Sequence, residues 1–261
     1  MESGTSIPGL EKSIPLPHQP EEAVMKPVGI ISGTIPLHEE DVFKNLKKTP
    51  VENQFGRALV FASEMVVFIP RHGVDAKQDI PPHRINHRAN RAALKGMGVE
   101  EVIGINSTGS LKRDVKPGMI MIPGDYISLS EAPTIFNDKA VHITPALNQE
   151  MRQRLIRTAE KLDITVRENG VYWQTSGPRL ETKAEIMMMS QFADIVGMTM
   201  ASEATIAQEL GLSYAAICSV DNYGHGLVEE PLEAEKIAQN ARRNTRTILK
   251  IISSYIEADS R

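Results

Sequence analysis

The stretch VIGINSTGS, residues 102–110, begins as an apolar run and ends in small polar residues. Apolar residues on consecutive positions are expected where both faces of a sheet are covered by other layers. In α/β sheets, ligands bind on the loops that follow such strands. The stretch therefore predicts a central strand, residues 102–107, with a candidate binding site at its end.

Similar runs alternate with amphipathic stretches on both sides of this strand. The other predicted strands are residues 28–32, 58–69, 119–127, 166–175, 195–199 and 214–220. The predicted helices are residues 85–97, 148–162, 181–192, 202–210 and about 232–256. This alternation predicts a single α/β domain whose site lies on loops at strand ends.

Composition limits the class of protein. The formal net charge of −4 argues against nucleic-acid binding, which requires many phosphates to be neutralised at once. No run approaches the roughly 18 apolar residues of a membrane span, and the first residues lack an apolar signal core. Cys218 is the only cysteine, so we expect a cytoplasmic protein without intrachain disulfides. Residues 1–26 contain several prolines and no periodicity, which predicts a flexible tail before a domain at 27–261.

Four predicted strands end in residues that can donate hydrogen bonds to an anion. The first is followed by Ser32-Gly33-Thr34, where glycine lets backbone N–H groups approach a ligand. A second ends in Arg71-His72, which adds a planar guanidinium fork. Asn106-Ser107-Thr108 and Met198-Thr199 end two more. Each segment alone also fits an ordinary turn or surface residue, but the four together favour a site for phosphate.

These segments, in this order, resemble the trimeric purine nucleoside phosphorylase and methylthioadenosine phosphorylase family. The resemblance runs from about residue 28 to residue 256. It is carried by GIISGT (29–34), RHG (71–73), INHRAN (85–90), TGSL (108–111), PG (117–118), GPRLETKAE (177–185) and VGMT (196–199) with Glu203. The resemblance implies the nucleoside phosphorylase fold, a central mixed sheet or barrel flanked by helices. It also implies a pentosyltransferase that splits a purine nucleoside with inorganic phosphate as co-substrate and needs no cofactor or metal.

The resemblance implies roles for the matching positions. The residues expected to bind phosphate are Thr34, Arg71, His72, Ser107 and Thr199. Met198 would lie beneath the ribose, and Leu180 stands where the family often has a phenylalanine that packs on the base. His142 matches a position that reaches into the neighbouring subunit's site, so a homotrimer or a dimer of trimers is implied.

Two positions bear on the choice of base. Glu181 matches a glutamate that accepts from N1–H in 6-oxopurine phosphorylases, and Asn222 matches an asparagine that contacts N7 and O6. Adenine-selective relatives usually carry serine and aspartate at these positions, so the pair predicts a preference for hypoxanthine or guanine. With Arg71 and His72 they form the predicted catalytic set. Glu181 also fits a carboxylate at a helix start, and Asn222 also fits a turn.

The 5′ substituent of the sugar is less well defined. Ungapped matching places Ala234 where hydroxyl-selective relatives have a histidine, which favours a methylthio group and S-methyl-5′-thioinosine as substrate. The nearby His225 could still reach the 5′ position. The alternatives are therefore methylthioadenosine, inosine or guanosine as substrate, a hydrolase that uses water, and a nucleoside-binding sensor without activity.

Three further features have no assigned role in this scheme. Asp221 matches a small residue on the phosphate side of relatives, and its role is open. His83 and His87 are four residues apart and could face one side of a helix, but no third metal ligand accompanies them. The methionine run at 187–189 is interpreted as core packing.

Overall fold

The computed structural model describes residues 26–33, 43–74, 79–130 and 133–259. Within them lies one sheet of eleven strands. The strands are β1 (Val28–Ser32), β2 (Lys47–Asn53), β3 (Gly56–Ala62), β4 (Val66–Pro70), β5 (Glu101–Ser110), β6 (Ile120–Ile122), β7 (Asp125–Ser128), β8 (Arg167–Glu168), β9 (Val171–Gln174), β10 (Ile195–Gly197) and β11 (Ser213–Tyr223). The helices are α1 (His87–Gly96), α2 (Gln149–Lys161), α3 (Lys183–Met189), α4 (Met200–Glu209), α5 (Ala234–Asp259) and the short 3₁₀ helix Pro82–Arg84.

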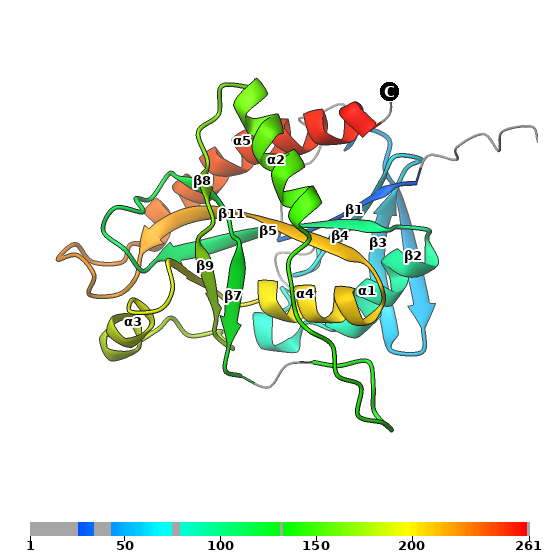
Figure 1. Cartoon of the computed structure of the whole chain (residues 1–261), viewed down its shortest axis with the longest axis horizontal. Helices are drawn as coiled ribbons and strands as arrows, with labels where there is room; N and C mark the ends of the chain where they lie inside the picture. Colours follow the sequence, from blue (N-terminus) through cyan, green and yellow to red (C-terminus); the bar gives the residue numbers. More distant parts are fainter. Residues whose placement is uncertain (1–25, 34–42, 75–78, 131–132, 260–261) are drawn as a thin grey trace, which may run out of the picture.

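β5 lies at the centre of the sheet, as its sequence predicts. It pairs in parallel with β1 and β11 and antiparallel with β10, so the sheet is mixed. Helices α2 and α5 cover one face, and α1 and α4 cover the other (Figure 1). Two core clusters fill these layers, one with Leu155 and Ile252 beneath α2 and α5, the other with Leu94 and Ala204 beneath α1 and α4. The predicted α/β class with a central mixed sheet is confirmed.

Several predicted strands are in fact two strands joined by a turn. Residues 58–69 divide into β3 and β4, because Ser63 lies in the turn between them and its hydroxyl accepts from the amide of Val66 at 3.2 Å. Residues 166–175 divide at Asn169, which has a positive φ of 60°. Residues 119–127 divide likewise into β6 and β7.

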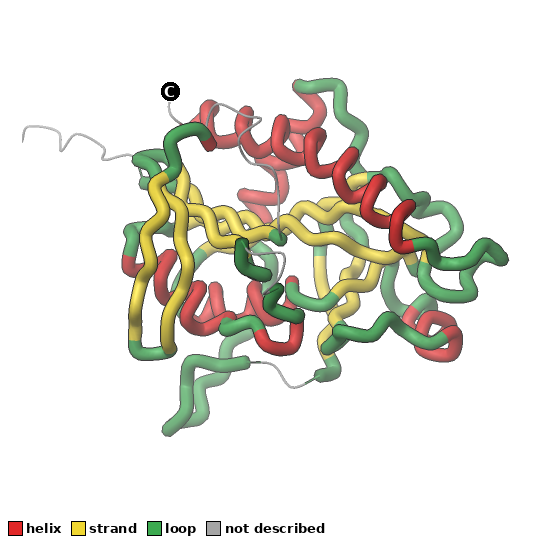
Figure 2. The backbone as a smooth tube through the Cα atoms, turned by 180° about the vertical axis from the view of Figure 1, so that it is seen from behind, coloured by secondary structure: helices red, strands yellow, loops and turns green. Residues whose placement is uncertain are grey.

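The β2–β3 hairpin at one end of the sheet was not fully predicted, because β2 lacks an apolar pattern (Figure 2). The predicted tail falls on residues 1–25, which lie outside the described residues, and on Lys26, whose ammonium pairs with Glu100 at 2.7 Å. In the described part of the chain, no helix combines the length and apolar character that crossing a membrane requires.

Candidate active site

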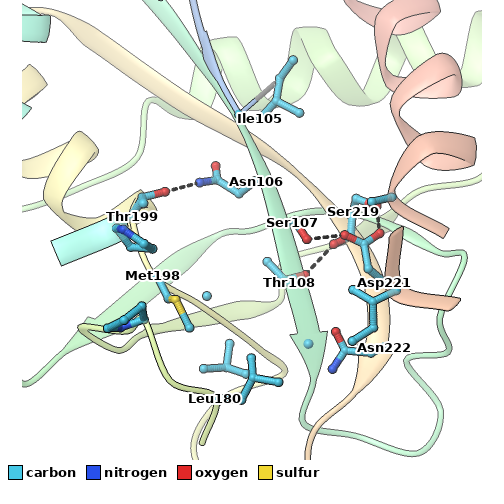
Figure 3. Close-up of a pocket in the computed structure, with 18 of the residues that line it drawn as sticks. Ile105, Asn106, Ser107, Thr108, Leu180, Met198, Thr199, Ser219, Asp221 and Asn222 are labelled. Atoms are coloured by element: carbon cyan, nitrogen blue, oxygen red, sulfur yellow. Dashed lines mark hydrogen bonds between the residues drawn. The ribbon is translucent and has the colours of Figure 1, made fainter. Parts of the chain in front are cut away.

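The ends of β1, β4, β5 and β11 and the segment after β10 surround a cavity of about 480 Å³. Figure 3 shows residues from several of these elements around it. The predicted site residues that line this cavity are Arg71, His72, Ser107, Leu180, Glu181, Met198, Thr199 and Asn222. Segments far apart in the sequence are thus brought to one place, as the strand-end argument predicts.

Three predicted site residues are not placed in the cavity. Thr34 lies outside the described residues. Ala234 begins α5, but its side chain is outside the described part of the structure. Ile237, Ala241 and Thr245 are the described residues of α5 that line the cavity. His142 is exposed on a loop and does not line the cavity of its own chain. The predicted role for His142 requires a neighbouring subunit and stays a prediction.

Arg71 is held mainly by the protein itself. Its Nη2 donates to the backbone carbonyls of Ile31 and Ile105, each at 2.7 Å, and its Nη1 donates to the Thr199 hydroxyl at 3.1 Å. Its Nε lies 2.9 Å from Glu203 Oε1, in an ion pair without hydrogen-bond alignment. Among the contacts of the described residues, one Nη1 proton is left for a ligand. Arg71 therefore offers a single donor where the sequence suggested a two-pronged fork.

Thr199 is oriented by the same contacts. Its hydroxyl oxygen accepts from Arg71 and, at 2.9 Å, from the amide of Asn106. Because the oxygen accepts both bonds, its own proton is free to be donated into the cavity. Thr199 is therefore placed to donate to an oxyanion.

Behind Arg71 lies a fully buried charge cluster. Glu203 on α4 has no exposed surface and contacts Arg71, Arg91 Nη2 at 3.1 Å and the Tyr214 hydroxyl at 2.8 Å. Burial raises the pKa of Glu203, but Arg71 and Arg91 outweigh it and hold that pKa below its ordinary value. The ionised Glu203 thus fixes Arg71 from behind, a role that the sequence did not reveal.

His72 has a defined tautomer. Its Nδ1 lies 2.7 Å from the carbonyl oxygen of Ile80, which can only accept, so Nδ1 carries a proton. The other nitrogen, Nε2, then accepts a hydrogen bond in the neutral ring and donates one in the charged ring. Nε2 of His72 can therefore donate to an anion in the cavity only when the ring is protonated.

Glu181 and Asn222 line the same cavity as Arg71. Glu181 precedes α3 and is not its capping carboxylate, since Thr182 and Glu185 form the capping box. One oxygen of Glu181 accepts from the Thr175 hydroxyl at 2.7 Å. Asn222 lies inside β11 and not in a turn, and its amide donates to the carbonyl of Tyr223 at 2.8 Å. The turn alternative for Asn222 therefore does not match the structure, whereas Glu181, just before the N-cap Thr182, still fits a carboxylate at a helix start.

Comparisons with known proteins agree with this geometry. Residues 27–257 match the profile of the Phosphorylase superfamily. The chain belongs to this superfamily. It is 45% identical over 235 residues to an Archaeoglobus fulgidus protein named "Probable 6-oxopurine nucleoside phosphorylase", covering 88% of this chain and 96% of that protein. It is 37% identical to a Methanocaldococcus jannaschii protein named "Probable S-methyl-5'-thioinosine phosphorylase", covering 88% and 91%.

Among solved structures, the phosphorylase resembles a methylthioadenosine phosphorylase from an antarctic soil metagenomic library. The two share 26% identity and a TM-score of 0.79, over 91% of this chain and 87% of the other. The nucleoside phosphorylase fold and the family resemblance are therefore confirmed. These relatives are pentosyltransferases, which confirms the interpretation of the chain as an enzyme of that class.

Two side observations from the sequence do not match the phosphorylase structure. His83 is exposed on the 3₁₀ helix while His87 is buried on α1, so the two do not face one side of a helix. Met187 and Met188 are 69% and 49% exposed, and only Met189 is in the core. The helical period of α3 turns the first two outwards, which a run of three identical residues conceals.

Gly177 sets the position of Met198 in the phosphorylase. Its φ is +62°, and an added Cβ would lie 2.4 Å from the Met198 sulfur. Gly177→Ala should displace Met198 and raise the KM for nucleoside roughly tenfold. This corresponds to a loss of about 1.4 kcal/mol of binding free energy. Gly211→Ala is the matched control, because Gly211 has a φ of +68° and no atom within 4 Å of an added Cβ. Equal nucleoside KM values in the two variants would contradict the role given to Met198.

Proposed function

We propose that this enzyme catalyses phosphorolysis of a 6-oxopurine nucleoside to the free base and a ribose 1-phosphate. The observation that carries the proposal is that one cavity joins oxyanion donors to a carboxylate and an amide suited to a purine edge. The names of the Archaeoglobus and Methanocaldococcus relatives support the same class of substrate. No cofactor is needed, since phosphate itself is the nucleophile.

Phosphate would bind along the wall formed by Arg71, His72, Ser107 and Thr199. From there one oxygen attacks C1′ as the glycosidic bond breaks through a transition state that resembles an oxocarbenium ion. Met198 lines the cavity between this wall and the purine edge, a place that suits the ribose. Positioning and electrostatic stabilisation supply most of the catalysis in such a site.

The purine edge would be selected by hydrogen-bond polarity. Glu181 is held through one oxygen by Thr175, and its second oxygen can accept from N1–H of hypoxanthine or guanine. N1 of adenine carries no proton, so its lone pair would face the Glu181 carboxylate without a hydrogen bond. Such mispairing costs on the order of 1–3 kcal/mol or more. Asn222 would contact N7 and O6 and stabilise the negative charge that the leaving base gathers.

The sugar end of the cavity favours an apolar 5′ group. Leu232, Ile237 and Ala241 line it from α5 and the loop before that helix. These apolar side chains suit a methylthio group, so S-methyl-5′-thioinosine is the favoured substrate. His225 also lines the cavity and favours the second candidate, inosine or guanosine with a free 5′ hydroxyl.

We further propose a homotrimer, alone or as a dimer of trimers, in the cytoplasm. His142 lies on an exposed loop, where it is free to contact a second subunit. Leu129, Met187 and Phe192 are 76%, 69% and 65% exposed, which suits a face covered by another chain. A buried single cysteine, Cys218, suits a reducing compartment.

Release of purine from methylthioinosine, inosine, guanosine and methylthioadenosine, each with and without phosphate, tests the proposal. We expect phosphate-dependent release of hypoxanthine, fastest from methylthioinosine. Fastest release from methylthioadenosine would refute the base selection by Glu181 and Asn222. Release that does not need phosphate would indicate a hydrolase, and no release would favour a nucleoside-binding protein.

A further inference from the structure

Asp221 and Asn222 are adjacent on β11, and an irregularity in this strand brings both of them to the cavity. Val220 pairs with Thr108 and Asn222 with the next residue, Gly109, so Asp221 is an extra residue in the β11–β5 ladder. Successive side chains of a regular strand point to opposite faces, whereas a bulge redirects them. Asp221 and Asn222 consequently both line the cavity, with Asp221 beside Ser107 and Ser219 (Figure 3).

The Asp221 carboxylate is tightly held. It is only 1% exposed, and it accepts hydrogen bonds from the hydroxyls of Ser107 and Ser219. The Ser219 oxygen in turn accepts from the Asn244 amide at 2.8 Å. A carboxylate fixed on both oxygens keeps its place when a ligand enters.

These contacts conflict with the simple expectation for Ser107. A serine hydroxyl has one proton, and Ser107 donates it to Asp221. Ser107 therefore cannot donate to phosphate while Asp221 is ionised, in contrast to Thr199, whose proton is free.

The surroundings of Asp221 allow it to hold a proton near neutral pH. Burial raises the pKa of Asp221 to about 6, against the hydrogen bonds from Ser107, Ser219 and Asn244. Several charged and titratable groups lie around it. Arg71, His72, Glu181 and His225 line the same cavity, Cys218 precedes it on β11, and Tyr223, Glu230, Glu233 and Lys236 line a smaller hollow that Asp221 also lines. Glu233 and Lys236 pair with each other at 2.7 Å.

We propose that Asp221 couples phosphate binding to the uptake of one proton. The protonated carboxyl donates to the Ser107 oxygen, and the Ser107 hydroxyl then turns its own proton towards phosphate. The proton comes from solvent on binding and returns to solvent when Asp221 ionises again. The inference rests on the proposed phosphorolysis and makes Asp221 a positioning residue that acts through Ser107.

Asp221→Asn tests the coupling, because asparagine has nearly the same shape and does not titrate. The quantity to measure is the ratio of the phosphate KM of the wild type to that of Asp221→Asn, from pH 5 to 8.5. Effects common to both proteins, such as the titration of phosphate itself, cancel in this ratio. We expect a flat ratio below about pH 6 and a rise towards tenfold per pH unit above it. A ratio that stays flat over the whole range would overturn the proposal.

Variants made in a Ser107→Ala background test whether Asp221 acts through the Ser107 hydroxyl. If Asp221 acts through the Ser107 proton, Ser107→Ala and Ser107→Ala/Asp221→Asn have equal phosphate KM values at every pH. A ratio that still rises with pH in this background would show repulsion by charge alone and overturn the role of Ser107.

Absence of phosphorolysis in the wild type would refute the proposed function but not this inference. Calorimetric titration with inorganic phosphate at pH 7, in two buffers of different ionisation enthalpy, then counts the protons taken up. The wild type should take up about one proton more than Asp221→Asn. Equal uptake would refute the coupling independently of turnover.

Discussion

Asn222→Ala is expected to lower kcat by roughly 10²–10³-fold while the KM for phosphate stays within about twofold. The effect is large because, in the proposed mechanism, the amide of Asn222 faces the charge that develops on the leaving purine. The proposed phosphate wall is built from other residues, among them Arg71 and Thr199, so it is unaffected. Steady-state kinetics with both substrates varied separates the two parameters.

Asn222→Asp is the companion variant, since it keeps the shape and reverses the hydrogen-bond polarity. It should shift preference towards adenine nucleosides, measured as the ratio of kcat/KM for methylthioadenosine to that for methylthioinosine. An unchanged kcat in Asn222→Ala would rule out the role at the leaving base. An unchanged ratio in Asn222→Asp would refute the account of base selection.

Glu203→Gln is expected to lower the free energy of unfolding by about 3–5 kcal/mol, because it leaves buried guanidinium groups without a counter-charge. Arg91 has no exposed surface, and its three guanidinium nitrogens find no hydrogen-bond partner among the described residues. Among the described residues, the ion pair with Glu203 therefore offsets the cost of burying the Arg91 charge. Urea unfolding followed by circular dichroism measures the loss.

Glu185→Gln provides the control, because it removes a carboxylate from the exposed pair with Arg179. Its unfolding midpoint should move much less than that of Glu203→Gln. Glu203→Gln should also raise the phosphate KM, since Arg71 loses the group that fixes it from behind. Equal shifts in the two variants would contradict the importance of the buried cluster.

The centre of the fold was predictable because burial on both faces leaves a clear pattern. β1 coincides with the predicted strand at 28–32, and β5 and β11 extend the predicted ones by a few residues. β2 was missed because most of its side chains are exposed and backbone hydrogen bonds to β3 define it. Backbone hydrogen bonds of this kind do not produce a periodic pattern of side chains in the sequence.

The site was predictable where a residue follows a strand, and not where it depends on register. Arg71, Ser107 and Thr199 come directly after or at the end of apolar runs, and the sheet brings those ends together. That the adjacent residues Asp221 and Asn222 both line the cavity depends on a one-residue shift between β5 and β11, which local sequence does not encode. The pairing of Glu203 with Arg91 joins two helices that are distant in the sequence, and the family motif includes Glu203 without its partner.

The long helix α5 has two parts, one that lines the cavity and one that packs in the core. Its first described turns, residues 235–243, have no fully buried side chain, and Ile237 and Ala241 line the part of the cavity where we propose that the sugar binds. Its later turns place Ile248, Ile252 and Tyr255 in the main core. The residues proposed to select the sugar can therefore be exchanged without disturbing those that hold the domain together. On this proposal, single substitutions in one short segment are enough to change the sugar specificity.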